Sequence, residues 1–244
     1  MKPVLFYLAQ SPWSEKARWA LDHHKIDYRP VEHLPLVFEP VVRLASRRPF
    51  VKPTVPMLVT GSESLTDSGS IARFAERTGR GAPLFPAGFE MEIEQWEATS
   101  EGMMSAGRAE LVRRLLGSDA ALAESVPAPL NRFAGPMKPV ARLAAKFLGR
   151  KHQVDKVSGP KAEATIEAGL AKLRAALERA GGRYLCGGSF SFADITMAVT
   201  LQYVRPHPRV GLGPALTEIW RNPELERSYA DLLGWRDQLV DAQR

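Results

Sequence analysis

The chain has 244 residues, of which 45% are hydrophobic and 25% are charged. This length and balance fit one large or two ordinary globular domains, and together with a single cysteine they exclude a peptide hormone or a small disulfide-stapled fold. The formal net charge of +6 admits nucleic acid or an acidic membrane surface as a partner, so its location in the chain matters.

The first 80 residues alternate strand-like and helix-like patterns. The run Val4–Leu8 is continuously apolar, as in a strand buried on both faces, and a helical pattern follows it directly. The start is too briefly apolar for a signal peptide, and the lone cysteine fits a reducing, cytoplasmic setting. The predicted order is βαβαββα, an α/β domain with elements at residues 4–8, 11–24, 28–31, 36–44, 57–59, 64–65 and 68–78.

Glycine and proline are concentrated between Gly79 and Gly88, and strand signals nearly vanish after that stretch. We therefore expect a domain boundary there, with a first domain at 1–80, a linker at 81–88 and an all-α domain at 89–244. Prolines crowd the chain near residues 127–139 and predict an irregular excursion. Helices are expected at about 89–116, 140–148, 160–180, 192–204 and 223–242.

The sequence Ser11-Pro12-Trp13-Ser14 directly follows the first predicted strand. Ser11 is a good helix N-cap, and Pro12 suits the first helical position, so capping is one interpretation. A hydroxyl at that position also lies among unpaired N–H groups at the positive end of the helix dipole, where a thiolate is stabilised. The motif therefore fits a cap, a thiolate site, or both.

Two further segments combine a structural and a functional interpretation. The Val55-Pro56 bond, just before a strand, can be cis and expose the Val55 backbone to an extended peptide, or be an ordinary trans proline at a strand edge. Asp67 and Ser68 begin the last helix of the first domain. They can simply cap it, or bind the carboxylate and ammonium groups of a ligand.

The segment from Phe190 to Ile195 has the pattern of a variant capping box. Ser191 would cap the helix and Asp194 would reach back to the backbone, while Phe190 would pack on Ile195. We interpret this as a folding signal. Cys186, close by, is expected to be a small packed residue.

Together these segments resemble the glutathione transferase superfamily. The resemblance covers nearly the whole chain and implies a thioredoxin-like first domain and a helical second domain. The first motif is similar to the serine-using theta and zeta classes, and to the omega class with serine at its cysteine position. The segments that carry it are SPWSEKAR at 11–18, TVPML at 54–58, DSGSI at 67–71, and the run from YLCG at 184–187 to FADI at 192–195.

The resemblance implies a transferase that activates the thiolate of glutathione, its cosubstrate, through Ser11 for attack on a small hydrophobic electrophile. It also implies a cytoplasmic homodimer that acts in detoxification, and the five scattered histidines give no metal-binding pattern. The alternative is a non-catalytic binding or regulatory protein with the same fold. The implied glutathione-binding residues are Trp13, Lys52, Thr54, Val55, Asp67 and Ser68, and the expected electrophile pocket comprises Met103, Met104, Gly107, Arg108 and Leu111.

The positive charge is concentrated between residues 127 and 161. This stretch holds eight basic residues and one acidic residue, Asp155, so its net charge of +7 exceeds the +6 of the whole chain. Lys138, Arg142, Lys146 and Arg150 recur at four-residue steps. We therefore expect a helix that packs by the opposite, apolar face, which contains Val140, Leu143, Ala144, Phe147 and Leu148. Weak contact of 127–161 with an anionic membrane is the alternative, and nucleic acid is not expected because no recognition motif is present.

Overall fold

The computed structural model describes residues 2–33, 54–126, 134–157 and 159–244. Contacts within the chain divide it into two compact units, each built from segments that are distant in sequence. The first unit contains 1–97, 179–199 and 238–244, and the second contains 98–178 and 200–237. The predicted division into 1–80 and 89–244 stays a prediction, because these units are not continuous in the chain.

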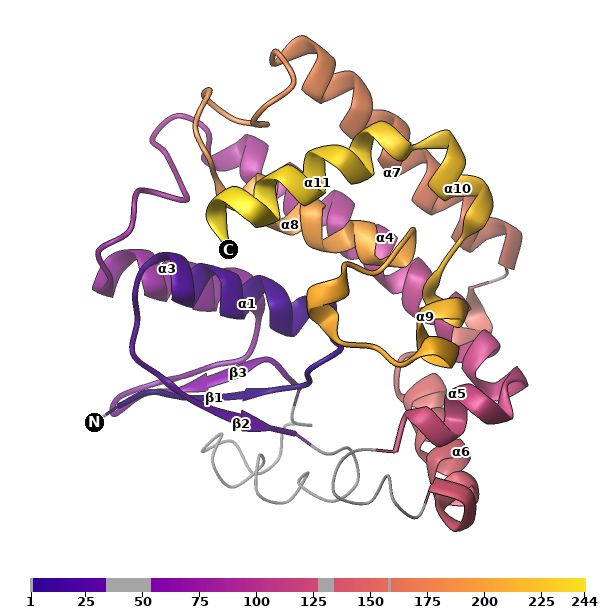
Figure 1. The fold of residues 1–244 in the computed structure, drawn as a ribbon. Helices are drawn as coiled ribbons and strands as arrows, with labels where there is room; N and C mark the ends of the chain where they lie inside the picture. The colour runs from indigo at the N-terminus through magenta and orange to yellow at the C-terminus, as the bar shows by residue number, and fades with distance from the viewer. Residues whose placement is uncertain (1, 34–53, 127–133, 158) are drawn as a thin grey trace. The chain divides into compact units, whose positions relative to one another are not determined.

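The first unit is built on a four-stranded mixed sheet (Figure 1). Its strands lie in the order β2-β1-β3-β4, with β1 parallel to β2 and antiparallel to β3. The α/β prediction is confirmed, and the helix expected at 36–44 lies outside the described residues. The elements are β1 (Val4–Tyr7), α1 (Pro12–His23), β2 (Arg29–Glu32), β3 (Met57–Val59), β4 (Ser64–Leu65) and α3 (Ser68–Thr78).

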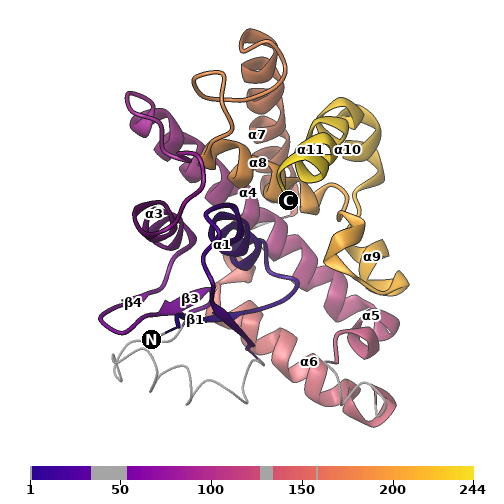
Figure 2. The same cartoon turned by 60° about the vertical axis from the view of Figure 1, so that its left-hand side comes forward.

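Helices α1 and α3 lie side by side on one face of this sheet (Figures 1 and 2). Leu5 and Leu58 point from the sheet into a core that includes Ile71 of α3, and all three are fully buried. Phe6 and Met57, one residue away on each strand, belong to a separate cluster. This alternation is the period-two pattern of a strand. Because the side chains of β1 and β3 are used in these two apolar clusters, the polar residues of a site are expected where the strands end.

The predicted linker at 81–88 is tied to the first unit by hydrogen bonds. The Glu76 carboxylate accepts from the backbone N–H groups of Leu84, at 2.7 Å, and Phe85, at 3.0 Å. The Phe192 N–H donates to the Leu84 carbonyl at 2.8 Å, and the Trp19 indole donates to the carbonyl of Gln243 at 3.1 Å. Segments from the far end of the chain therefore complete this unit.

The chain after residue 89 is mostly helical, as predicted. The expected helix at 192–204 ends early and continues as a 3-10 turn, and the helix expected at 223–242 is broken at Tyr229. Two short helices, α5 and α9, were not predicted. The helices are α4 (Glu90–Gly117), α5 (Asp119–Glu124), α6 (Ala134–Lys151), α7 (Gly159–Arg179), α8 (Phe192–Thr200), α9 (Pro214–Trp220), α10 (Pro223–Ser228) and α11 (Ala230–Gln243), with 3-10 turns η2 (Val154–Lys156), η3 (Leu201–Tyr203) and η4 (Pro208–Val210).

Helix α6 departs from the prediction in its bounds and in its buried face. It begins at Ala134, inside the expected irregular excursion, and contains Pro139. Ala145 and Gly149 face inward, whereas Val140 is 48% exposed and Leu143 is 59% exposed. The expectation that Val140 and Leu143 pack inward was wrong. The small residues allow the helix to pack closely against its neighbours, and this turns the larger apolar side chains outward.

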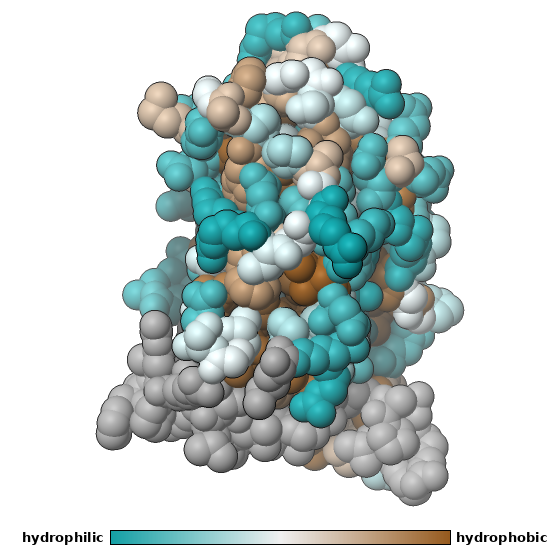
Figure 3. All heavy atoms as spheres, turned by 90° about the vertical axis from the view of Figure 1, so that its left-hand side faces the viewer, coloured by the Kyte–Doolittle hydropathy of each residue, from teal (hydrophilic) through white to brown (hydrophobic). Residues whose placement is uncertain are grey.

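One face of the molecule is shown as spheres in Figure 3, where hydrophilic side chains surround small apolar areas. Scattered apolar side chains of this kind are ordinary on a protein surface. Among the described residues, no helix has the length and hydropathy required to cross a bilayer.

Candidate functional site

Three of the predicted site segments meet at one edge of the sheet. In the antiparallel pairing of β1 with β3, Phe6 lies opposite Met57, so the end of β1 adjoins the start of β3. Ser11 follows β1, and Val55 precedes β3. In the next pairing Leu65 lies opposite Leu58, so the chain leaves β4 towards the same edge and reaches Asp67 there.

Ser11 lies at the N-cap of α1, and its backbone carbonyl accepts from the Glu15 N–H at 3.0 Å. Within the described part of the chain, its side chain makes no capping hydrogen bond, and the residue is half-buried. The local turn is instead held by Ser14, whose buried hydroxyl accepts from the Leu8 N–H at 3.1 Å. The Ser11 hydroxyl therefore remains beside the positive end of α1 without a capping role.

The segment before β3 lies against the segment before α3. The Thr54 hydroxyl donates to the Thr66 carbonyl at 3.4 Å, which places Thr54 and Val55 next to the start of α3. The Val55-Pro56 peptide bond is cis, one of the two alternatives that the sequence left open. Lys52 lies outside the described residues, and Trp13, in the first turn of α1, is half-buried.

Two carboxylates lie beside the first turn of α3, that of its N-cap Asp67 and that of Glu97 from α4. Asp67 caps the helix by accepting from the Ser70 N–H at 2.7 Å, and Ser68 is buried next to it. A Cβ atom added to Gly69 would lie 2.4 Å from a Glu97 carboxylate oxygen and 3.4 Å from the Asp67 carboxylate. Gly69 therefore leaves the space that Glu97 occupies beside Asp67.

Glu97 was not predicted as a site residue. Burial raises the pKa of its carboxyl group, and Arg73 and Lys16 oppose that rise, whereas Asp67 adds to it. Arg73 lies 3.4 Å from Glu97, and Lys16 is buried in α1. Glu97 belongs to α4 and follows Asp67 by 30 residues, so no local pattern in the sequence could have indicated their proximity.

This arrangement can bind a small zwitterion and hold a sulfur atom. The first N–H groups of a helix have no partner within it and favour a carboxylate, and the carboxylates of Asp67 and Glu97 favour an ammonium group. The Ser11 hydroxyl can donate a hydrogen bond to an anionic sulfur. The described residues include no group of three or more potential metal ligands.

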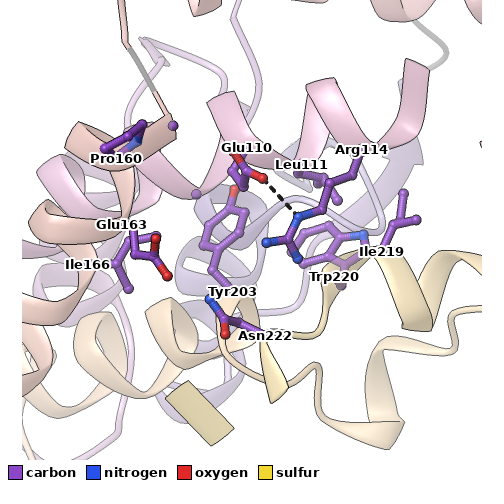
Figure 4. Close-up of a pocket in the computed structure, with 12 residues that line it drawn as sticks. Glu110, Leu111, Arg114, Pro160, Glu163, Ile166, Tyr203, Ile219, Trp220 and Asn222 are labelled. Carbon is purple, nitrogen blue, oxygen red and sulfur yellow. Dashed lines mark hydrogen bonds and ion pairs between the residues drawn. The ribbon is translucent and has the colours of Figure 1, made fainter. Parts of the chain in front are cut away.

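The second unit contains a cavity of about 300 Å³ (Figure 4). The Tyr203 ring stacks on Trp220 with centroids 5.1 Å apart and packs against Gly107, where an added Cβ would lie 2.3 Å from the ring. In Figure 4, residues of α7 lie on one side of Tyr203 and Arg114 lies on the other. The lining residues are Gly107, Glu110, Leu111, Arg114, Gly159, Pro160, Glu163, Ile166, Tyr203, Ile219, Trp220 and Asn222.

Two charged side chains of the cavity wall, Glu110 and Arg114, pair with each other at 3.0 Å. Arg114 also donates to the Arg221 carbonyl at 2.7 Å. Burial raises the pKa of Tyr203, which keeps its hydroxyl neutral. With Leu111 and Ile219 beside the stacked rings, the cavity suits an apolar or aromatic ligand.

The residues expected to form the electrophile pocket occupy different environments. Gly107 and Leu111 line this cavity. Met103 and Met104 are buried, and Met103 packs against Gly169 of α7, where an added Cβ would lie 2.2 Å from its sulfur. Burial lowers the pKa of Arg108, which lies one residue after Gly107 on α4.

Two family models match the chain. The model of the glutathione S-transferase N-terminal domain matches residues 5–83, and that of the glutathione S-transferase C-terminal domain matches residues 108–238. No curated protein matches the sequence.

Solved structures share the fold at low sequence identity. A glutathione S-transferase of Methylobacillus flagellatus with glutathione bound is 20% identical, with a TM-score of 0.60 and coverage of 98% of this chain and 95% of that one. A Methylobacterium radiotolerans glutathione S-transferase in complex with glutathione sulfonate is 18% identical, with a TM-score of 0.61 and coverage of 98% and 90%.

A glutathione transferase of Phanerochaete chrysosporium is 14% identical, with a TM-score of 0.62 and coverage of 98% and 96%. The structures at these identities support the fold. The two family models together cover the sheet edge of the first unit and, apart from Gly107, the residues that line the cavity of the second. The chain therefore belongs to the glutathione S-transferase family.

Proposed function

We propose that the protein is a glutathione transferase in which Ser11 stabilises the thiolate of bound glutathione. The observation that carries this proposal is the position of the Ser11 hydroxyl at the N-terminus of α1, where it has no capping role among the described residues. Glutathione is the proposed cosubstrate because solved members of the family contain it or its sulfonate.

Ser11 acts as a hydrogen-bond donor to sulfur and is not itself a nucleophile. A free thiol has a pKa of about 8.5, and each unit by which that pKa falls corresponds to about 1.4 kcal/mol in favour of the thiolate. The proton released by the thiol passes to solvent. With a chlorodinitrobenzene electrophile, the thiolate sulfur attacks the ring carbon that bears the chlorine. The C–S bond forms, the C–Cl bond breaks, and chloride leaves to solvent.

The remaining glutathione contacts follow the family resemblance. The Val55 backbone would pair with the cysteinyl part, with Thr54 and Lys52 alongside and Trp13 in the first turn of α1. Asp67 and Ser68 would hold the γ-glutamyl end. We add Glu97 to this set, because its carboxylate lies at the same turn of α3 and favours the γ-glutamyl ammonium group.

For the electrophile we propose a small hydrophobic molecule bound by side chains of α4. Gly107 and Leu111 support this choice because they line a cavity with apolar and aromatic walls. Met103, Met104 and Arg108 remain part of the proposal. A cytoplasmic homodimer that acts in detoxification without a metal is proposed on the family resemblance alone.

Ser11→Ala is expected to lower glutathione-dependent turnover of a chlorodinitrobenzene electrophile by about 10- to 100-fold, the effect of losing one hydrogen bond to a charged group. Its free energy of unfolding should stay within about 0.5 kcal/mol, because no capping bond is lost. Ser118→Ala is the matched control. Ser118 caps α5 by accepting from the Ala121 N–H at 3.2 Å, so its loss should cost about 1 kcal/mol and leave turnover unchanged.

Unchanged turnover in Ser11→Ala would contradict the assigned role. Calorimetric titration with glutathione distinguishes the proposed transferase from the non-catalytic alternative. Saturable binding together with turnover supports the transferase, whereas no binding at millimolar glutathione would favour a binding or regulatory protein with the same fold.

A further inference from the structure

The outward face of α6 combines exposed apolar side chains with cations. Val140 and Leu143 lie three residues apart and are both exposed, and Lys146 and Arg150 continue the same side of the helix at steps of three and four residues. Ala145 and Gly149 are buried on the opposite side. An added Cβ at Gly149 would lie 3.4 Å from Val112 of α4.

This pattern is unusual for a face in contact with water alone. Among the described residues, the large hydrophobic side chains that are exposed are Met91, Val140 and Leu143. Met91 is single, on α4, whereas the other two share one turn of α6. Exposed apolar groups gathered with cations on one helix face indicate a contact surface, whereas isolated ones do not.

The four cations of α6 whose side chains the structure describes fall into two groups. Lys138 and Arg142 both lie near the Asp119 carboxylate, at 3.6 and 2.7 Å, and Arg142 also donates to the Leu116 carbonyl. Lys146 and Arg150 are exposed, and within the described part of the chain neither forms an ion pair. The second group is therefore available to an external anion.

The sequence around α6 also lacks negative charge. Residues 125–154 contain no aspartate or glutamate and include six basic residues, namely Arg132, Lys138, Arg142, Lys146, Arg150 and Lys151. An anionic surface that approaches this helix therefore meets no carboxylate from the helix itself. The helix itself therefore contributes only positive side-chain charge to that approach.

We propose that the outward face of α6 binds the surface of an anionic lipid bilayer. Val140 and Leu143 enter the boundary between headgroups and acyl chains, and Lys146 and Arg150 remain at the level of the phosphates. This distribution is the one that holds an amphipathic helix in the plane of a bilayer. Contact of this kind requires no spanning helix, and the described residues contain none.

A bilayer fits the face better than a folded partner does. The bilayer surface supplies many equivalent anions, so Lys146 and Arg150 can bind it without a fixed geometry. The layer between headgroups and acyl chains also accepts single apolar side chains such as Val140 and Leu143, which need no matching pocket. The affinity should be low and reversible, because few groups take part. It should fall as the salt concentration rises, because exposed charges are screened.

The test is cosedimentation of the full chain with vesicles of phosphatidylcholine and phosphatidylserine, compared with phosphatidylcholine alone. Binding is expected only to the anionic vesicles. Replacing Lys146 and Arg150 together by Gln should lower the partition coefficient about 25-fold, since each basic side chain contributes about fivefold. The matched control replaces Arg179 and Arg227, which are exposed elsewhere, and should leave binding nearly unchanged.

The apolar contribution is tested by Leu143→Gln, with Met91→Gln as the control at another exposed position. Leu143→Gln should weaken vesicle binding at least several-fold, whereas Met91→Gln should leave it unaltered. All four positions changed on α6 and α4 are exposed, so circular dichroism and glutathione turnover should match the parent protein.

Three results would overturn the proposal. One is equal binding to neutral and anionic vesicles. Another is an equal loss of vesicle binding in the α6 variants and in their controls. The third is a lower sedimentation coefficient of Leu143→Gln without lipid, which would show that the face is covered by a second copy of the chain. None of these results bears on Ser11, so the two proposals fail independently.

Discussion

Ser11 and Ser14 are three residues apart, yet their hydroxyls have different surroundings. Ser14 is buried and accepts the Leu8 N–H, so it fixes the turn between β1 and α1. Ser11 is left half-buried at the N-terminus of α1, where it can donate to sulfur. The pair has the spacing of a redox-active cysteine pair, but hydroxyls do not exchange with disulfides, so we do not expect reductase activity from these positions.

His24 is a buried group that makes stability depend on pH. Its side chain is 1% exposed, and desolvation, with a smaller effect from His23, lowers its pKa from 6.5 to about 4. The Glu76 carboxylate lies 3.8 Å away. Gly79 and Gly81 also pack closely against His24, since a Cβ added to them would lie 2.5 Å from its Cβ and 2.9 Å from its Nδ1. The folded state therefore holds this imidazole neutral under conditions in which the unfolded chain would protonate it.

We predict that this contribution to stability is complete above about pH 6.5 and is lost as the pH falls towards about 4, because the unfolded state binds the proton first. The loss attributable to His24 should reach at most about 3 kcal/mol. Urea unfolding of the parent protein and of His24→Gln, between about pH 4 and 6.5, measures this loss of stability. The variant should show a shallower decline, and parallel declines would contradict the prediction.

At the scale of elements, the capping box before α8 confirms a folding signal that the sequence carries. Asp194 is fully buried and accepts from the N–H groups of Leu185, at 2.9 Å, and Ser191, at 2.8 Å, and from the Ser191 hydroxyl. Burial raises the pKa of this carboxyl group to about 6. Cys186 lies four residues before this segment, and its buried thiol has a pKa raised to about 12, chiefly by desolvation.

Asp194→Ala should lower the free energy of unfolding by about 3 kcal/mol or more, because it leaves two buried N–H groups without an acceptor. Ser191→Ala removes one hydroxyl donor and should cost about 1 kcal/mol. Urea unfolding of both variants at pH 7 gives the comparison. Equal losses would contradict the dominant role of the carboxylate.

Elements with strong local signals were predicted closely, and elements that depend on distant contacts were not. Helix α3 begins and ends where its cap and Gly79 indicate. Helices α5 and α9 are only six and seven residues long, and the Glu124 carboxylate fixes the start of α9 by accepting from Ala215 and Leu216. That link spans 91 residues and leaves no periodic pattern in the sequence.

At the scale of the whole molecule, the sequence predicted an α/β part followed by helices but not how distant segments complete each unit. The C-terminal Arg244 pairs with Glu15 of α1 at 3.0 Å, and Phe192 bonds to the predicted linker. Of the candidate site residues, Ser11 and Asp67 could be predicted from the sequence because each directly precedes a predicted helix. Glu97 could not be predicted, because only tertiary packing brings α4 to the start of α3.

The role of Ser11 is tested most directly by a pH titration of the thiolate absorbance of bound glutathione, in the parent protein and in Ser11→Ala. In the parent protein we predict a thiol pKa about one to two units below that of free glutathione. In Ser11→Ala, with glutathione still bound, the pKa should return most of the way to the free value. The same lowered pKa in both proteins would show that Ser11 does not activate the thiol.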